Sequence, residues 1–209
     1  MNSLSAPVTT LTDDVCIVGD VRSATGSIRD DVGSTVYKIS LLNGTELKEE
    51  VTASFGPAFN VASTLRKGDL IRYKKDGFGR INSISKICSI QGLKNDFSDM
   101  IYFTESTETA KFGFVYNTIP DTFDYYTIEF VDKLTLSYMP DGSDSQISYE
   151  LKIAKDGEVP IYLYNRTTGW IEPGSLDNTL ASMYAGNSAS KAFVLMESSD
   201  VKAVVIIED

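Results

Sequence analysis

Apolar and polar positions alternate along most of this chain, in short stretches that are rich in Val, Ile, Thr, Tyr and Phe. The stretches recur about every 8–12 residues and are separated by Gly, Asp, Asn and Ser, a pattern typical of β-strands joined by turns. In the first half we expect strands at residues 15–24 and 35–42 and a hairpin turn at Asn43-Gly44. After a loop with one helical turn, LIRYKK and RINSISKICSI should pair around DGFG as a closing hairpin.

The strand pattern restarts after the polar and irregular stretch 91–100. One short helix is expected at 175–186, where Ser175 can cap the first turn and Gly186 can end the last. The remaining apolar stretches predict strands at 101–106, 112–118, 124–131, 133–139, 148–154, 159–166 and 170–175, and a terminal hairpin formed by 191–198 and 201–209.

The predicted fold class is therefore all-β, with two tandem small β-barrel or sandwich domains. The first covers residues 1–92, a linker covers 93–100, and a second, larger and acidic domain covers 101–209. Each half closes on a similar hairpin, GDLIRYKKDGFGRINSISKI in the first and SKAFVLMESSDVKAVVII in the second, which suggests two copies of one module. A single β-sandwich of about 200 residues remains the alternative.

The charge distribution limits the partners that the chain can attract. The 209 residues carry a formal net charge of −10, and all of that excess lies beyond residue 100. An acidic chain repels phosphate backbones and anionic membranes at long range, so nucleic acid would need a local basic patch. The stretch 67–84 is the one candidate, because it places five basic residues around Tyr73 and Phe78. The same composition is also typical of an ordinary solvated hairpin.

Candidate chemistry is sparse. The chain has no histidine, which removes the usual general base and the commonest transition-metal ligand. The Ser-x-x-Lys matches at Ser83 and Ser188 lie outside helices, where the lysine would not share a face with the serine. Cys16 and Cys88 are expected to be isolated buried thiols, with a disulfide between them as the alternative. We expect no catalytic residue, no cofactor and no metal, although two distant carboxylates could still meet in the fold.

No stretch approaches the roughly 18–20 apolar residues of a membrane-spanning helix, and the first residues lack the features of a signal peptide. Either the protein works where it is made, or the chain is a piece of a longer one.

Aromatic residues crowd the second half and carry the strongest functional signal. They are typical of a sandwich core with Tyr at its rim, and also of a protein contact surface, since Tyr and Trp anchor interfaces. Trp170, in a turn–strand segment, is the best candidate for an exposed anchor. The predicted interface residues are Trp170, Tyr162, Tyr164, Tyr73 and Phe78.

Three functions fit these observations. The favoured one is a structural or assembly module without chemistry. The alternatives are a single-stranded nucleic-acid binder that uses Tyr73 and Phe78 as stacking platforms, and a carbohydrate-binding or hydrolytic β protein.

The phrases VYKISLLNGTELKEEVTAS, LRKGDLIRYKKDGFGRINSI and GSLDNTLASMYAGNSASKAFVLMESSDVKAVVII resemble β-rich repeats in structural proteins of bacteriophages that infect Firmicutes. Similar repeats occur in S-layer-type surface proteins of those bacteria. The resemblance transfers no catalytic residues. It implies a non-enzymatic virion component, either capsid decoration or tail-associated, that assembles in the host cytoplasm. Its partners would be copies of itself, as a homo-oligomer, or other structural proteins. The alternative is a module of the bacterial cell surface.

Overall fold

The structure is a computed structural model that describes residues 15–90, 108–121, 125–132, 148–154, 159–175 and 191–208. The chain divides into two compact units, the first holding the described residues up to 90 and the second those from 108 onward. Strands dominate both units, so the predicted all-β class is confirmed. The predicted linker 93–100, the predicted strands 101–106 and 133–139, and the predicted helix beyond Ser175 lie outside the described residues.

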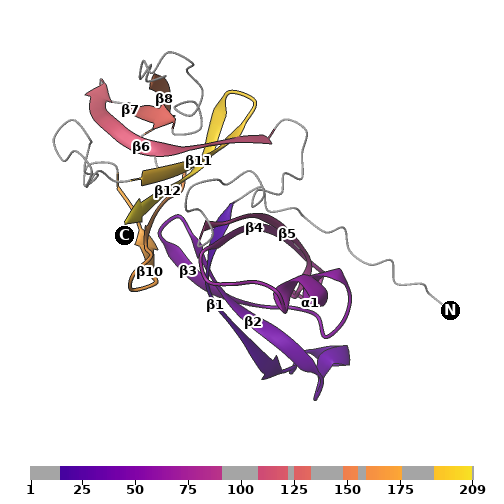
Figure 1. Cartoon of the computed structure of the whole chain (residues 1–209). Coiled ribbons are helices and arrows are strands. Elements are labelled where there is room, and N and C mark those ends of the chain that lie inside the picture. Colours follow the sequence, from indigo (N-terminus) through magenta and orange to yellow (C-terminus); the bar gives the residue numbers. More distant parts are fainter. Residues whose placement is uncertain are drawn as a thin grey trace, which may run out of the picture. The chain divides into compact units, whose positions relative to one another are not determined.

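The first unit is a five-stranded antiparallel sheet in the order β3-β2-β1-β4-β5. Its strands curve around a common interior (Figure 1). All of the predicted strands of this half form. The elements are β1 (Cys16–Thr25), the 3-10 helix η1 (Arg29–Asp31), β2 (Thr35–Asn43), β3 (Glu46–Val51), α1 (Pro57–Ala62), β4 (Asp69–Lys75) and β5 (Ile81–Ser89).

Local sequence explains the connections of this sheet. The predicted hairpin turn is confirmed, with Gly44 at φ 56° between β2 and β3, a left-handed conformation that costs glycine little. Helix α1 begins at Pro57, where the missing N–H is not needed. The helix packs on β2 through the rings of Tyr37 and Phe59, whose centroids are 5.0 Å apart. None of the helices in the described residues could span a lipid bilayer.

Alternation along the strands builds the core of the first unit. Ile71 and Tyr73 of β4 are buried in it, whereas Arg72 and Lys74 between and beyond them are partly exposed, as the sequence predicts. Adjacent residues of a strand point to opposite faces, so one face of each strand supplies the core.

The two edge strands of this sheet approach each other at one point. Thr52, just after β3, forms a parallel bridge with Ile81 at the start of β5. The amide of Ala53 donates to the carbonyl of Ile81 at 3.0 Å. One bridge does not make a continuous ladder, so the sheet is strongly curved and not closed.

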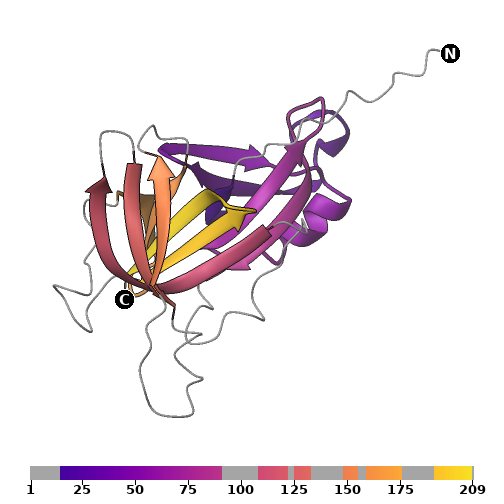
Figure 2. The same cartoon turned by 90° about the horizontal axis from the view of Figure 1, so that it is seen from above.

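The second unit is a seven-stranded sheet in the order β10-β9-β12-β11-β6-β7-β8. Figure 2 shows strands of this sheet, coloured from rose to yellow, lying side by side. Every neighbouring pair is antiparallel except β9 and β12, which are parallel. Strand β8 also contacts β12, four places away in the order, so this sheet curls back on itself. The strands are β6 (Glu108–Asp121), β7 (Tyr125–Asp132), β8 (Ser148–Ala154), β9 (Ile161–Asn165), β10 (Trp170–Pro173), β11 (Lys191–Glu197) and β12 (Asp200–Glu208).

The hairpin of β11 and β12 lies in the middle of the second sheet. Residues 192–196 and 203–207 are all buried, which explains why the two strands are apolar without alternation. The corresponding hairpin of the first unit, β4–β5, lies at an edge. The described strands therefore do not support the prediction that the two halves are copies of one module.

The cysteine prediction is confirmed. Cys16 and Cys88 are both buried thiols and form no disulfide. Burial, with a smaller effect from the charge of Asp69, raises the pKa of the Cys88 thiol to about 12.

A buried ion cluster joins three loops of the first unit. The Arg80 guanidinium, after the β4–β5 turn, donates from Nη1 to Asp31 Oδ2 at 2.5 Å and from Nε to Asp76 Oδ2 at 2.8 Å. Asp31 Oδ1 also accepts from the Ser54 amide at 2.9 Å, in the loop after β3. Arg80 and Asp31 are only 8% and 1% exposed. The cluster therefore holds the β1–β2 loop, the β3–α1 loop and the β4–β5 turn together.

The pKa values of the two aspartates reflect these contacts. Burial alone would raise the pKa of Asp31, but hydrogen bonds from Ser54 and Arg80 outweigh it and lower that pKa below its ordinary value of 3.8. The pKa of Asp76 is lowered in the same way, because bonds from Arg80 and the Phe78 amide outweigh burial. Both carboxylates are thus held in their charged form.

We predict that Arg80→Met destabilises the first unit by about 3 kcal/mol, because it leaves Asp31 buried without a cation. Urea unfolding followed by far-UV circular dichroism measures the change. Arg22→Met is the matched control, since Arg22 forms an exposed ion pair with Glu49 and should leave the transition almost unchanged. Equal effects of the two substitutions would contradict a stabilising role for the cluster.

The cluster also predicts a pH dependence. Since the pKa values of Asp31 and Asp76 are lower in the folded state than their ordinary 3.8, the unfolded state binds more protons near that pH. The stability that the charged forms of Asp31 and Asp76 contribute is complete above about pH 5. It is lost as the pH falls through the pKa values that these two groups have in the folded state. Unfolding free energies of the wild type and Arg80→Met, measured between neutral pH and pH 3, should converge on acidification. A constant difference between the two proteins would refute the linkage.

Candidate interaction site

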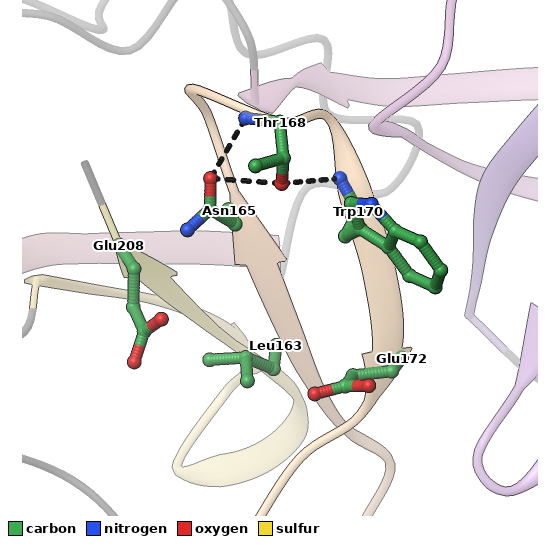
Figure 3. A pocket seen from close by; sticks show the side chains of 6 residues that line it. All are labelled: Leu163, Asn165, Thr168, Trp170, Glu172 and Glu208. Atoms are coloured by element: carbon green, nitrogen blue, oxygen red, sulfur yellow. Dashed lines mark hydrogen bonds between the residues drawn. The ribbon is translucent and has the colours of Figure 1, made fainter.

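A pocket of about 240 Å³ lies on one face of strands β9, β10 and β12 in the second unit. Figure 3 shows the side chains that surround it. They combine one aromatic ring, one apolar side chain, an amide, a hydroxyl and two carboxylates. The lining residues are Leu163, Asn165, Thr168, Trp170, Glu172 and Glu208.

Strand register brings these residues together. Asn165 of β9 is paired on one side with Trp170 of β10 and on the other with Glu208 of β12. Leu163 is paired with Glu172 one pleat further along. Since residues two apart share a face, all five side chains project from the same side of the sheet. The carboxylates of Glu208 and Glu172 lie on either side of Leu163 (Figure 3).

The turn between β9 and β10 orders one wall of the pocket. The side-chain oxygen of Asn165 accepts hydrogen bonds from the Thr168 amide at 2.8 Å and from its hydroxyl at 3.0 Å. Thr168 Oγ1 in turn accepts from the Trp170 amide at 3.3 Å. Gly169 supplies the positive φ that the turn requires, at 70°. A chain of bonds therefore connects Asn165 to the start of β10.

Trp170 is 67% exposed, and β10 is an edge strand of the described sheet. Exposing most of an indole to water is unfavourable, and Trp is strongly enriched among the residues that anchor protein interfaces. An edge strand also presents unpaired backbone groups to a partner. The prediction that Trp170 lies at the surface is confirmed.

The pocket is acidic. No cation of the described residues forms an ion pair with Glu172 or Glu208, and no group of three or more potential metal ligands occurs among those residues. Two negative charges and an aromatic face favour a positively charged or hydrogen-bond-donating group. The pair does not suit acid catalysis of glycoside hydrolysis, because such an acid needs an apolar enclosure and Glu172 is exposed to solvent.

For two of the predicted interface residues, the structure corrects the prediction of a surface position. Tyr162 and Tyr164 are 0% and 1% exposed and are interior residues. They alternate along β9 with Leu163 and Asn165, so they point to the opposite face from the pocket.

The two aromatic residues predicted in the first unit differ in their surroundings. Tyr73 is 6% exposed, and its hydroxyl donates to buried Glu50 at 3.5 Å, so it is a core residue and not a surface platform. Phe78 is 42% exposed, but the Arg80 guanidinium lies 5.2 Å from the centre of its ring. The Phe78 ring therefore already forms a cation–π contact with Arg80 of the same chain.

Sequence reasoning missed Glu172 and Glu208 as site residues. Glu172 could have been predicted from the sequence, because it lies two residues from Trp170 on a predicted strand and must therefore lie on the same face as Trp170. Glu208 has no local signal, since it reaches the pocket through the parallel pairing of β12 with β9.

Comparison of the chain with known protein families, with curated proteins and with solved structures finds no significant match to any of them.

We predict that Asn165→Ala destabilises the second unit by about 1 kcal/mol, because it removes the acceptor of the two turn hydrogen bonds. Urea unfolding followed by the fluorescence of Trp170, the only tryptophan of the chain, measures the effect. Thr167→Ala is the matched control, as Thr167 is exposed in the same turn. The turn would not be the ordering element if both variants unfolded like the wild type.

Proposed function

We propose that this protein is a non-catalytic structural protein that assembles through protein–protein contacts, with the Trp170 edge of the second sheet as one contact surface. The observation that carries the proposal is the 67% exposure of Trp170 on edge strand β10 beside an acidic pocket. A partner that covers the indole removes apolar area from water, and one that pairs with β10 satisfies its free backbone groups.

The setting that we propose is a bacteriophage virion, as capsid decoration or a tail-associated component, assembled in the host cytoplasm. The sequence resemblance described above supports this setting. The all-β architecture with an exposed edge strand is compatible with it. The alternative is a module of a bacterial surface layer, which the same resemblance supports.

We further propose that each unit is a small, partly open β-barrel. For the first unit, the support is the strand order and the parallel bridge between Thr52 and Ile81, which brings the edge strands together around the core. A five-stranded, partly open antiparallel barrel is a common way of protecting sheet edges. For the second, the support is the contact between β8 and β12.

Single-stranded nucleic acid is a weaker candidate for the first unit, because part of the basic stretch 67–84 is internally neutralised. Lys75 pairs with Glu50 at 2.6 Å, and Arg80 is bound by Asp31 and Asp76. Tyr73 is buried, so it offers no stacking face to a base.

The proposal predicts that the purified protein self-associates and that Trp170→Ala weakens the association. A buried tryptophan anchor contributes about 2 kcal/mol to binding, so its loss should raise the dissociation constant of self-association roughly thirtyfold. Size-exclusion chromatography with light scattering, over a range of concentrations, measures the shift toward monomer, and electron microscopy shows the assemblies.

The matched control is Leu47→Ala, because Leu47 of β3 is 69% exposed but lies in the first unit. Equal weakening by both substitutions would argue against a specific Trp170 contact. A persistent monomer that binds single-stranded oligonucleotides in a salt-dependent manner would favour the nucleic-acid function instead.

A further inference from the structure

We propose that the pocket beside Trp170 binds an arginine side chain of a partner protein, through Glu172, Glu208 and the indole. This inference rests on the proposed function, and it names the chemistry of the partner surface that meets the Trp170 edge.

The charge of the pocket favours a cationic side chain. Glu172 and Glu208 project into one pocket from β10 and β12, and no cation of the described residues neutralises them there. A partner that covers the pocket with apolar side chains alone would desolvate both carboxylates without compensation, which is unfavourable. A partner cation removes that penalty. The formal −10 charge beyond residue 100 also attracts a basic surface at long range.

The indole of Trp170, which lines the pocket, favours arginine over lysine. Cations bind to the face of tryptophan better than to other rings, and arginine does so more often than lysine. The planar guanidinium is weakly hydrated and has five donors, so it can stack on an indole while donating to more than one carboxylate. Trp170 and Glu172 share a face of β10, with Glu208 two strands away on the same side. The Asn165 side-chain oxygen is already occupied by Thr168, which leaves the carboxylates as the main acceptors.

The size of the pocket fits a single side chain. The pocket volume of about 240 Å³ is below the roughly 300–1,000 Å³ of pockets that hold drug-sized ligands. It suits one long side chain better than an extended oligosaccharide. A neutral sugar could stack on Trp170, but it would leave both negative charges without a counter-charge.

The experiment uses the full chain and the fluorescence of Trp170, which is its only tryptophan. The probe is Nα-acetyl-arginine amide, titrated at constant ionic strength, with the citrulline analogue as the neutral probe of the same shape. We expect a saturable change with the arginine probe and none with citrulline. Glu172→Gln and Glu208→Gln should each weaken binding about two- to fivefold, as expected for partly exposed ion pairs.

Glu197→Gln is the matched control, because Glu197 lies on β11 of the same sheet and pairs with Lys202 outside the pocket. It should bind the arginine probe like the wild type. Circular dichroism of each variant shows whether it is folded, and the indole N–H resonance of Trp170 supplies a second readout in the wild type.

Three results would overturn the inference: an equal response to citrulline, a response to cellobiose but not to the arginine probe, or no saturable response of the folded wild type. The proposed function is judged separately by the Trp170→Ala assembly measurement. If that substitution disrupts assembly while the arginine probe does not bind, the contact surface stands and the arginine site is refuted. If the probe binds while assembly is unaffected, the site stands and the assembly role of Trp170 is refuted.

Discussion

The two-residue period of the β-strand is the constraint on which both the cores and the candidate site depend. It puts Ile71 and Tyr73 into the core of the first unit while Arg72 faces outward. On β9 it separates buried Tyr162 and Tyr164 from Leu163 and Asn165. The same rule sets Trp170 and Glu172 side by side on β10, so a surface anchor and an acidic group share one face of the sheet.

In the first unit, ionic contacts decide how the basic hairpin behaves. Arg80 is buried against Asp31 and Asp76, and Lys75 is held by Glu50, so these cations stabilise the fold and are poorly placed to bind phosphates. Burying a guanidinium is tolerable only because two carboxylates and several hydrogen bonds accompany it. The hairpin that most suggested a nucleic-acid interface is therefore the means by which three loops are tied together.

Much of the architecture follows from local pattern. Hydrophobic alternation, the Gly44 turn and the Asp76–Arg80 turn identify the strands of the first unit, and the apolar runs of β11 and β12 identify the central hairpin of the second. The exposed position of Trp170 beside a turn could also be predicted. The burial of Tyr162 and Tyr164 could not, because an aromatic strand has two faces, and its sequence alone does not say which of them is covered.

The amino-acid sequence by itself determined the strands and the turns, because propensity and periodicity act over a few neighbouring residues. Only the tertiary structure decided which strands are neighbours and which charges meet. Asp31 meets Arg80 across 49 positions, and Glu208 joins Asn165 and Trp170 through a parallel strand pair. Pairings of this kind depend on the free energy of the whole sheet, including its core and loop closure, and no short stretch of sequence contains that information.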